Sequence, residues 1–370
     1  MKPHIPPFRY SFDAADIDHI TAEIRELLQT GALLTMGDEG RMLEARFRHY
    51  TGARHVVSVA SGTAALEIIL RGLHVDGGEV IVPTNTFGAT VVATLRAGAV
   101  PVFADAAEDL SVSVADVARK LTPRTRAVIT VHIGGLISPH TLKLKELCEA
   151  HEVPLVEDAA HALGATLNGT MAGGFGVAAA FSLFSTKVLT SGEGGLIASN
   201  NDAIQDAALL LRDHAKQPDG SMATTGYNWR LTEVQAIIAN TQLRRLDERI
   251  ARRNQIARTY DELLMDAVGA TLLRPPPNVR HNRYKYVVLL EGRSPAALGH
   301  SLLDQFGIEL GGPVYRVPCH RQAAFKQFVH GSFPAADRLC ASHVCPPIYP
   351  ALTAEQAAYV AGALKTVLTS

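Results

Sequence analysis

The sequence FSLFSTKVLTSGEGG, residues 181–195, decides how the rest of the chain is interpreted. From residue 173 to 201 only two residues carry a charge, Lys187 and Glu193, and apolar runs lie on both sides of the lysine. Such runs are typical of buried strands. A lysine at the end of a buried strand is partly desolvated, which lowers its pKa and favours a Schiff base with a carbonyl. Taken alone, the pattern is more typical of a solvated lysine in a tight turn, so other sites must decide.

Composition and charge describe a globular chain of 370 residues. It has 35 Lys plus Arg, 36 Asp plus Glu and 47% hydrophobic residues. This balance argues against a general nucleic-acid or membrane-surface binder, and no apolar run reaches the ~18 residues of a spanning helix. The N-terminus is unlike a signal peptide, and the four cysteines indicate neither a metal site nor a disulfide scaffold. We expect a cytoplasmic protein without nucleic-acid, membrane or metal partners.

Strand and helix patterns alternate through the first 214 residues, which predicts right-handed crossovers and a mainly parallel sheet flanked by helices. A chain this long exceeds one ordinary core. We expect a large α/β domain over residues 1–240, including an N-terminal helical segment, and a smaller α+β domain over 241–370. A long helix over about 233–264, opened by a capping box at 232–235, would join them. The strands are expected at 55–60, 79–83, 100–104, 126–133, 153–156, 177–184, 196–199, 284–290 and 314–317.

Several polar or aromatic residues are expected at the carboxyl ends of these strands, where ligands of such sheets gather. Asp158 follows an apolar strand and could keep the nitrogen of pyridoxal 5'-phosphate (PLP) protonated while Lys187 holds its carbonyl. The run Ser61-Gly62-Thr63 lies between a strand and a helix, where free N–H groups favour a phosphate. Ser182 could add a phosphate donor, and Phe87 could stack on the ring.

Each of these residues has a simpler explanation when it is considered alone. Asp158 and Ser61 could be helix N-caps, Ser182 could bond within its own sheet, and Phe87 could pack a helix start. Their joint placement at the ends of different strands indicates a PLP site. No Gly-x4-Gly-Lys-Ser/Thr or His-Glu-x-x-His motif points to a nucleotide hydrolase or a zinc enzyme.

From about residue 31 to 350 the chain resembles the sugar aminotransferases of the DegT/DnrJ/EryC/StrS family, which are PLP-dependent transferases of fold type I. The resemblance rests on four motifs and their order. These are SGTAAL at 61–66, EDAAHA at 157–162, FS at 181–182 with Lys187 and GEGG at 192–195, and GYNWRL at 226–231.

The resemblance implies a role for each residue of the cofactor site. It makes Lys187 the Schiff-base lysine and proton shuttle and Asp158 the partner of the pyridinium nitrogen. It assigns Phe87 to stacking and His161 to the ring oxygen. The residues that it assigns to the phosphate are Gly62, Thr63 and Ser182, with Ser61 beside them.

Further residues of the resemblance concern the substrate and the partner subunit. Asn228 resembles a residue that reaches the phosphate from a neighbouring subunit, which implies a homodimer with shared active sites. Tyr315 and His320 resemble a segment that faces the sugar. A surface-loop histidine remains an equal alternative for His320.

The implied reaction is a ping-pong transamination through a pyridoxamine intermediate, from L-glutamate to a keto group of a nucleotide-linked (deoxy)hexose. One alternative is a transaminase acting on a cyclitol ketone such as an inosose. A sugar dehydrase is disfavoured because those relatives carry histidine at the position of Lys187. A non-catalytic PLP-binding protein is disfavoured by Lys187 and Asp158. The sequence leaves open the sugar, the nucleotide, the carbon that is aminated and the pathway.

Overall fold

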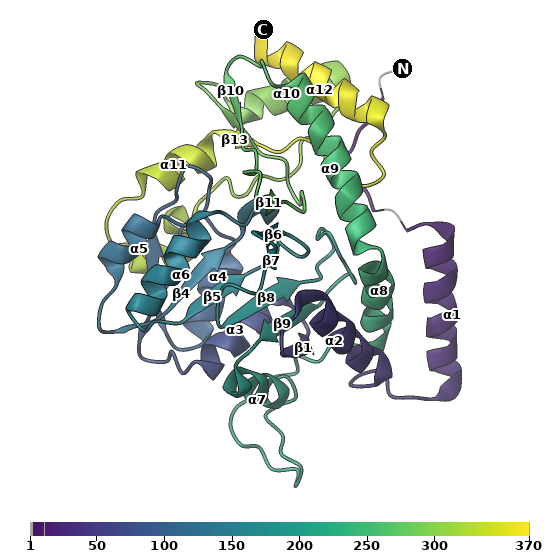
Figure 1. Cartoon of the computed structure of the whole chain (residues 1–370), viewed down its shortest axis with the longest axis vertical. Helices are drawn as coiled ribbons and strands as arrows, with labels where there is room; N and C mark the ends of the chain where they lie inside the picture. The colour runs from purple at the N-terminus through teal and green to yellow at the C-terminus, as the bar shows by residue number, and fades with distance from the viewer. Residues whose placement is uncertain (1–2, 11, 370) are drawn as a thin grey trace.

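A seven-stranded sheet forms the centre of the molecule in the computed structural model, which describes residues 3–10 and 12–369 (Figure 1). The strand order is β1-β9-β8-β5-β4-β2-β3, and only β9 runs antiparallel to its neighbours. The predicted, mainly parallel sheet is therefore confirmed. The strands are β1 (His55–Val59), β2 (Glu79–Pro83), β3 (Val100–Ala104), β4 (Thr125–Val131), β5 (Leu155–Asp158), β8 (Ala178–Ser182) and β9 (Gly195–Ser199).

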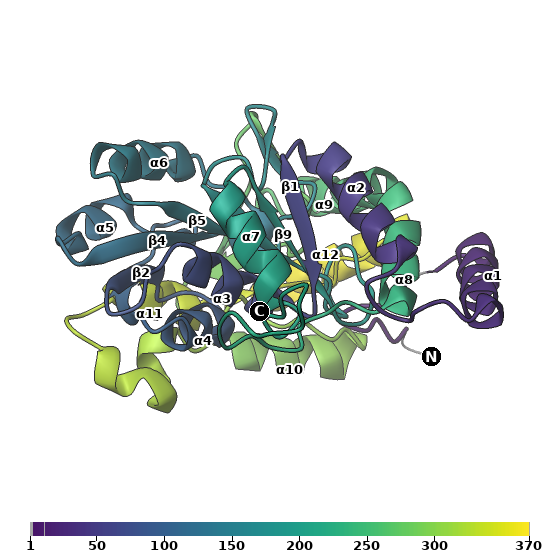
Figure 2. The same cartoon turned by 90° about the horizontal axis from the view of Figure 1, so that it is seen from below.

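Helices cover both faces of this sheet (Figure 2). They are α2 (Asp38–Thr51), α3 (Gly62–Gly72), α4 (Gly88–Arg96), α5 (Val114–Lys120), α6 (His140–Ala150), α7 (Asp202–Leu211) and α8 (Glu233–Arg244), with the short 3-10 turn η1 (Ile133–Gly135). One apolar cluster, around Ile69 and Val91, packs α3, α4 and α7 on one face. On the other face, Phe47 belongs to a cluster under α2 and α8, and Leu144 to one under α5 and α6.

The segment expected to form one helix over 233–264 is divided in two, which corrects that prediction. Helix α8 begins at the predicted capping box and ends at Arg244, and α9 runs from Leu246 to Leu263. Between them, Arg245 has φ −114 and ψ 12, outside the range of a regular helix. The domain division at residue 240 stays a prediction.

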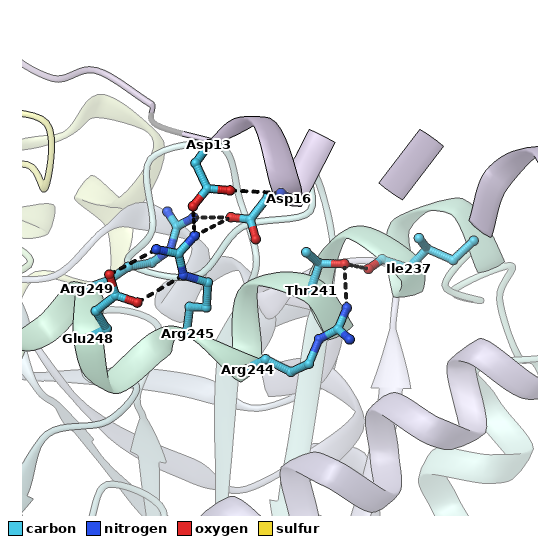
Figure 3. A network of polar contacts seen from close by, with 8 residues as sticks. All are labelled: Asp13, Asp16, Ile237, Thr241, Arg244, Arg245, Glu248 and Arg249. Atoms are coloured by element: carbon cyan, nitrogen blue, oxygen red, sulfur yellow. Dashed lines mark hydrogen bonds and ion pairs between the residues drawn. The ribbon is translucent and has the colours of Figure 1, made fainter. Parts of the chain in front are cut away.

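Polar contacts tie this junction to the N-terminal helix α1 (Ala14–Thr30) (Figure 3). The Arg245 guanidinium contacts the carboxylates of Asp13 and Glu248, and Arg249 Nη2 lies 3.0 Å from Asp16 Oδ2. Asp13 also caps α1 by accepting the N–H of Asp16. Apart from this junction, α1 stands at the side of the molecule beside α8 (Figure 1).

The C-terminal part has its own apolar cluster, which includes Tyr260, Leu302 and Leu364. Its sheet has the order β10-β12-β13 and is antiparallel. A further small sheet, β11-β6-β7, lies between the two parts of the chain. The remaining elements are β6 (Thr166–Leu167), β7 (Thr170–Met171), β10 (Ala270–Leu272), β11 (Val279–Arg280), β12 (Val288–Leu290), β13 (His343–Val344), α10 (Pro295–Phe306), η2 (Cys319–Arg321), η3 (Ala323–Phe328), α11 (Pro334–Ala341) and α12 (Ala354–Thr369).

Two predicted strands of this part differ from the structure. The strand expected at 284–290 is paired only over β12, and residues 314–317 form a loop rather than a strand. Both stretches line cavities, as described below. Within the described residues, none of the helices combines the length and apolar character that crossing a membrane requires.

Candidate active site

Strand β5 ends in two carboxylates that point to opposite faces of the sheet, because side chains alternate along a strand. Glu157 is fully buried on the α6 side, where its Oε2 lies 2.8 Å from His132 Nε2. It also accepts backbone N–H groups from residues 173, 175 and 176, each at 2.7 Å. Asp158 faces the side covered by α3 and α4. Glu157 therefore has a structural role, since it fixes the loop at residues 173–176. Asp158 is the carboxylate of the pair that faces away from these bonds and is available to a ligand.

The carboxylate of Asp158 is fixed by two donors. Thr90 Oγ1 on α4 donates to Oδ2 at 2.8 Å, and the N–H of Ala160 reaches Oδ1 at 3.2 Å. Thr86 Oγ1 lies 2.7 Å from Thr90 Oγ1 and orients it. Burial raises the pKa of Asp158, while the Thr90 hydrogen bond and the charge of Lys187 act in the opposite direction. A cationic group that binds in this cavity would therefore interact strongly with the Asp158 carboxylate, because burial has removed water from it.

Lys187 lies in the turn that joins β8 to β9. Its backbone N–H bonds to Phe184 O at 2.9 Å, and Gly192 with φ 85 and Gly194 with φ 148 allow the chain to return. Burial lowers the pKa of the Lys187 amine to about 8, although Asp158 acts to raise it. A substantial fraction of this amine is therefore neutral near physiological pH. That is the desolvated lysine that the sequence predicted, and a neutral amine can attack a carbonyl.

The N-terminus of α3 forms an open cradle at the end of β1. Ser61 caps the helix by accepting the N–H of Ala64 at 3.1 Å. Among the described residues, no hydrogen-bond partner is found for the N–H groups of Gly62 and Thr63. A Cβ on Gly62 would lie 3.0 Å from the Cβ of Ser182, so glycine permits the close approach of β8. Free N–H groups at the positive end of a helix beside a serine suit a phosphate.

A cavity of about 330 Å³ joins these groups. This volume lies in the range of small-molecule sites. The predicted residues that line it are Ser61, Gly62, Thr63, Phe87, Asp158, His161, Ser182, Lys187 and Tyr315. A buried carboxylate, a partly neutral lysine and a phosphate cradle thus face one space, as bound PLP would require.

His161 is held in one orientation at the side of the cavity. Its Nδ1 accepts the N–H of Gly134 at 3.3 Å, and its Nε2 lies 3.1 Å from the hydroxyl of Tyr315. Burial moves the pKa of His161 well below its usual value, so the ring is neutral. Because Nδ1 is an acceptor, the proton of the neutral ring belongs on Nε2. Tyr284 lies against the imidazole with ring centroids 4.3 Å apart.

The chain matches the DegT/DnrJ/EryC1/StrS aminotransferase family over residues 15–365. It belongs to this family. The predicted resemblance is therefore confirmed, and the match extends beyond the residues 31–350 from which it was inferred.

Two curated relatives are similar in sequence to this aminotransferase over nearly its whole length. The UDP-N-acetyl-3-dehydro-α-D-glucosamine 3-aminotransferase of Acidithiobacillus ferrooxidans is 33% identical and covers 100% of this chain and 96% of its own length. The dTDP-3-amino-3,4,6-trideoxy-α-D-glucose transaminase of Micromonospora megalomicea is 34% identical over 97% of this chain and 96% of the relative.

A solved structure confirms the fold class. Spr1654 of Streptococcus pneumoniae, determined in a PLP form, superposes with a TM-score of 0.90 and 25% identity over 99% of this chain and 98% of that one. This aminotransferase therefore has the predicted fold-type-I architecture, with a large sheet flanked by helices and a smaller C-terminal α+β part.

Two predicted site residues of the aminotransferase lie away from the cavity. His320 is held between Thr84 Oγ1, at 2.7 Å from its Nδ1, and Asp337 Oδ1, at 2.9 Å from its Nε2. It lines another hollow, with Arg321 and Phe333. The structure therefore does not bring His320 to the site, and both ring nitrogens are already used.

Asn228 is exposed and bridges to Asp213 on the chain's own surface. Its predicted role concerns the active site of a second subunit, so its distance from this cavity is compatible with that role.

The residues around the site that were not predicted include Thr90, Thr186 and Tyr284. Thr90 could have been found from its place, since it lies in the first turn of a helix that begins just after a strand end. Thr186 precedes the lysine directly, and its hydroxyl lies 3.1 Å from that of Tyr284. Tyr284 comes from a distant, irregular stretch with no local signal. Within the described residues, no group of three acidic, histidine or cysteine side chains could hold a metal ion.

Proposed function

We propose that this aminotransferase binds PLP in the cavity between Asp158 and Lys187 and transfers the amino group of L-glutamate to the keto group of a nucleotide-linked hexose. One observation carries the proposal. The carboxylate, the lysine of lowered pKa and the free N–H groups of Gly62 and Thr63 all face one cavity of about 330 Å³. The residues of the chain therefore fit both ends of the cofactor.

When bound, PLP would supply an electron sink that acidifies the C–H bond next to the amino group of the substrate. The remaining work belongs to the chain. Lys187 Nζ, with a pKa of about 8, can take the proton from the substrate Cα and return it at neutral pH. Asp158 would hold a proton on the ring nitrogen, fixed in place by Thr90. Phe87, with 62% of its surface exposed, would cover the ring.

The choice of acceptor rests on the relatives and on the space outside the cavity. The names of the two relatives reported above contain sugars linked to UDP and dTDP. A second hollow of about 670 Å³ adjoins the cavity at Phe87 and Tyr315 and includes Arg316. A cation beside an open hollow suits the diphosphate of a nucleotide sugar. This hollow supports a nucleotide-linked substrate over a free cyclitol.

The homodimer with shared sites is also part of the proposal. Apolar side chains on α1 and the following loop are exposed in the single chain, among them Ile17 at 52%, Leu28 at 62% and Leu33 at 76%. A large exposed apolar surface of this kind is typical of an interface. Asn228 would enter the phosphate site of the second subunit. The cytoplasm remains the proposed compartment, because all four cysteines are buried and unpaired.

The test uses the purified protein loaded with PLP. L-Glutamate should change the absorbance of the bound cofactor and yield one equivalent of 2-oxoglutarate per site. A panel of nucleotide-linked ketosugars and inososes is then offered to the aminated enzyme, with products identified by mass spectrometry. An amino sugar nucleotide supports the proposal. Amination of an inosose alone would assign the cyclitol alternative, and no glutamate-dependent change would overturn the transaminase proposal itself.

A further inference from the structure

A second cavity lies behind the cofactor site and contains two cations that the proposed reaction has not used. Its volume is about 290 Å³, and Arg253 and Lys285 line it. It shares a wall with the cofactor cavity, because His161, Thr186, Tyr284 and Tyr315 line both. Pro7 and Phe8 of the N-terminal segment also line it.

Arg253, on α9, is only 7% exposed and incompletely bonded. Its Nη1 donates to the carbonyl oxygens of Arg283 and Ile348, at 3.1 and 2.7 Å. Its Nε is buried and has no hydrogen-bond partner within residues 3–10 and 12–369. Burial lowers the pKa of Arg253 to about 10, which leaves the guanidinium charged at neutral pH.

Lys285 is the second cation, and its Nζ makes no hydrogen bond or ion pair in the described part of the chain. The amine lies 5.3 Å from the centroid of the Tyr284 ring and beside Gly311, where a Cβ would be 3.5 Å from Nζ. Asp261, an acid near the C-terminal end of α9, contacts Arg274 and Arg283 instead. Two cations at a cavity wall without a carboxylate partner indicate a site for an anion.

The position of Lys285 relative to Lys187 indicates which kind of anionic ligand the second cavity suits. The Lys187 amine lies 5.0 Å from the centroid of the same Tyr284 ring. Both amines therefore lie beside one ring at the wall that the two cavities share, which suits a small ligand with an amino group at Lys187 and an anionic group near Lys285. The hollow for a nucleotide diphosphate lies elsewhere, at Phe87 and Arg316.

We propose that the cavity formed by Arg253, Lys285 and Gly311 binds the side-chain carboxylate of a dicarboxylic amino donor. This inference rests on the proposed function, since it names the recognition element for the donor. It makes Lys285 a specificity-determining residue that contacts glutamate and takes no part in proton transfer. Arg253 supplies a second charge from the floor of the cavity.

The substitution Lys285→Met tests the inference in the PLP-loaded protein. Lys285 makes no side-chain hydrogen bond among the described residues, so its replacement breaks none. The half-saturating concentration of L-glutamate for the change in cofactor absorbance should rise about tenfold, a loss of about 1.4 kcal/mol. With L-glutamine, which lacks the side-chain charge, the same value should change less than about twofold. Lys285→Arg should restore most of the preference, and Lys326→Met, at an exposed lysine, is the matched control.

A binding measurement separates this inference from the proposed reaction. Calorimetry compares glutarate with its monoamide, neither of which can react. Wild-type protein should bind glutarate more tightly, and Lys285→Met should lose that preference. An equal effect of Lys285→Met on glutamate and glutamine, or on the nucleotide sugar alone, would overturn the inference. The absence of any preference for glutarate in the wild type would do so as well. If glutamate leaves the cofactor unchanged while the glutarate preference holds, only the proposed reaction fails.

Discussion

Two walls enclose the cofactor cavity, and they are built in different ways. The sheet wall carries Asp158 and Lys187, where the carboxylate and the amine act on each other and hydrogen bonds fix the carboxylate. The C-terminal wall carries Tyr284 and Tyr315, which line both cavities, and beside them Lys285, which lines the second cavity and has no acidic partner among the described residues. This difference indicates a division of labour. In the proposed reaction, the sheet wall would perform the chemistry common to all substrates, and the loop wall would select among them.

The strongest test of this division is Lys187→Ala. Without the amine, no group remains that can bond covalently to the carbonyl of the cofactor or move the Cα proton, so turnover should fall by about 10⁴-fold or more. The cofactor absorbance typical of a lysine adduct should disappear, and circular dichroism should show an unchanged fold. Measurable turnover with intact lysine-adduct absorbance would contradict the role of the sheet wall.

Asp158→Asn should have the next largest effect. The amide keeps the shape but loses the charge that stabilises a protonated ring, so turnover should fall by about 10²- to 10³-fold. PLP should still bind, because the phosphate cradle is untouched. Turnover and PLP content are measured on one preparation. A rate near that of the wild type would show that the carboxylate is not part of the chemistry.

Tyr284→Phe tests the loop wall and should have a much smaller effect. It removes one hydrogen bond, to Thr186 at 3.1 Å, and keeps the ring against His161. We expect less than about a tenfold change in turnover, within the worth of one hydrogen bond. The steady-state rate is measured with saturating substrates for the variant and the wild type. A loss as large as that of Asp158→Asn would show that both walls take part in the chemistry.

The smallest expected effect is a displacement of a pH profile. PLP uptake by the cofactor-free protein requires the neutral Lys187 amine, so its rate should rise with pH and be half-maximal at about pH 8. Asp158 raises the pKa of Lys187 and Lys285 lowers it. The midpoint should therefore move to lower pH in Asp158→Asn and to higher pH in Lys285→Met. Stopped-flow absorbance measures the rates, and shifts in one common direction would contradict the opposite electrostatic roles of the walls.

The same two walls explain what could be predicted from sequence. Asp158 and Lys187 each follow an apolar strand in a stretch with few charges, so local patterns place them. Tyr284 and Lys285 follow Arg283, whose φ of 56 marks an irregular turn that no periodicity reports. The break between α8 and α9 at Arg245 was not predicted, for a similar reason. Its guanidinium contacts Asp13, a residue more than two hundred positions away, and such contacts leave no local trace.

His320 is the opposite case, a residue that a motif places near the substrate but that this chain does not bring to its own cofactor cavity. Its loop carries the expected residues, but Thr84 and Asp337 hold both nitrogens. Tyr315, five residues earlier, does reach the cavity. Sequence alone could not separate the two, because which side chain of a loop turns inward depends on the neighbours it meets after folding.

The neighbouring carboxylates at the end of β5 limit how this part of the chain can evolve. Glu157 anchors three backbone amides on one side of the sheet, and Asp158 serves the cavity on the other. A slip of one position along β5 would exchange the two sides. The segment before residue 157 can therefore accept replacements of its apolar residues, but a single inserted or deleted residue would displace both the anchor and the carboxylate proposed to hold the cofactor.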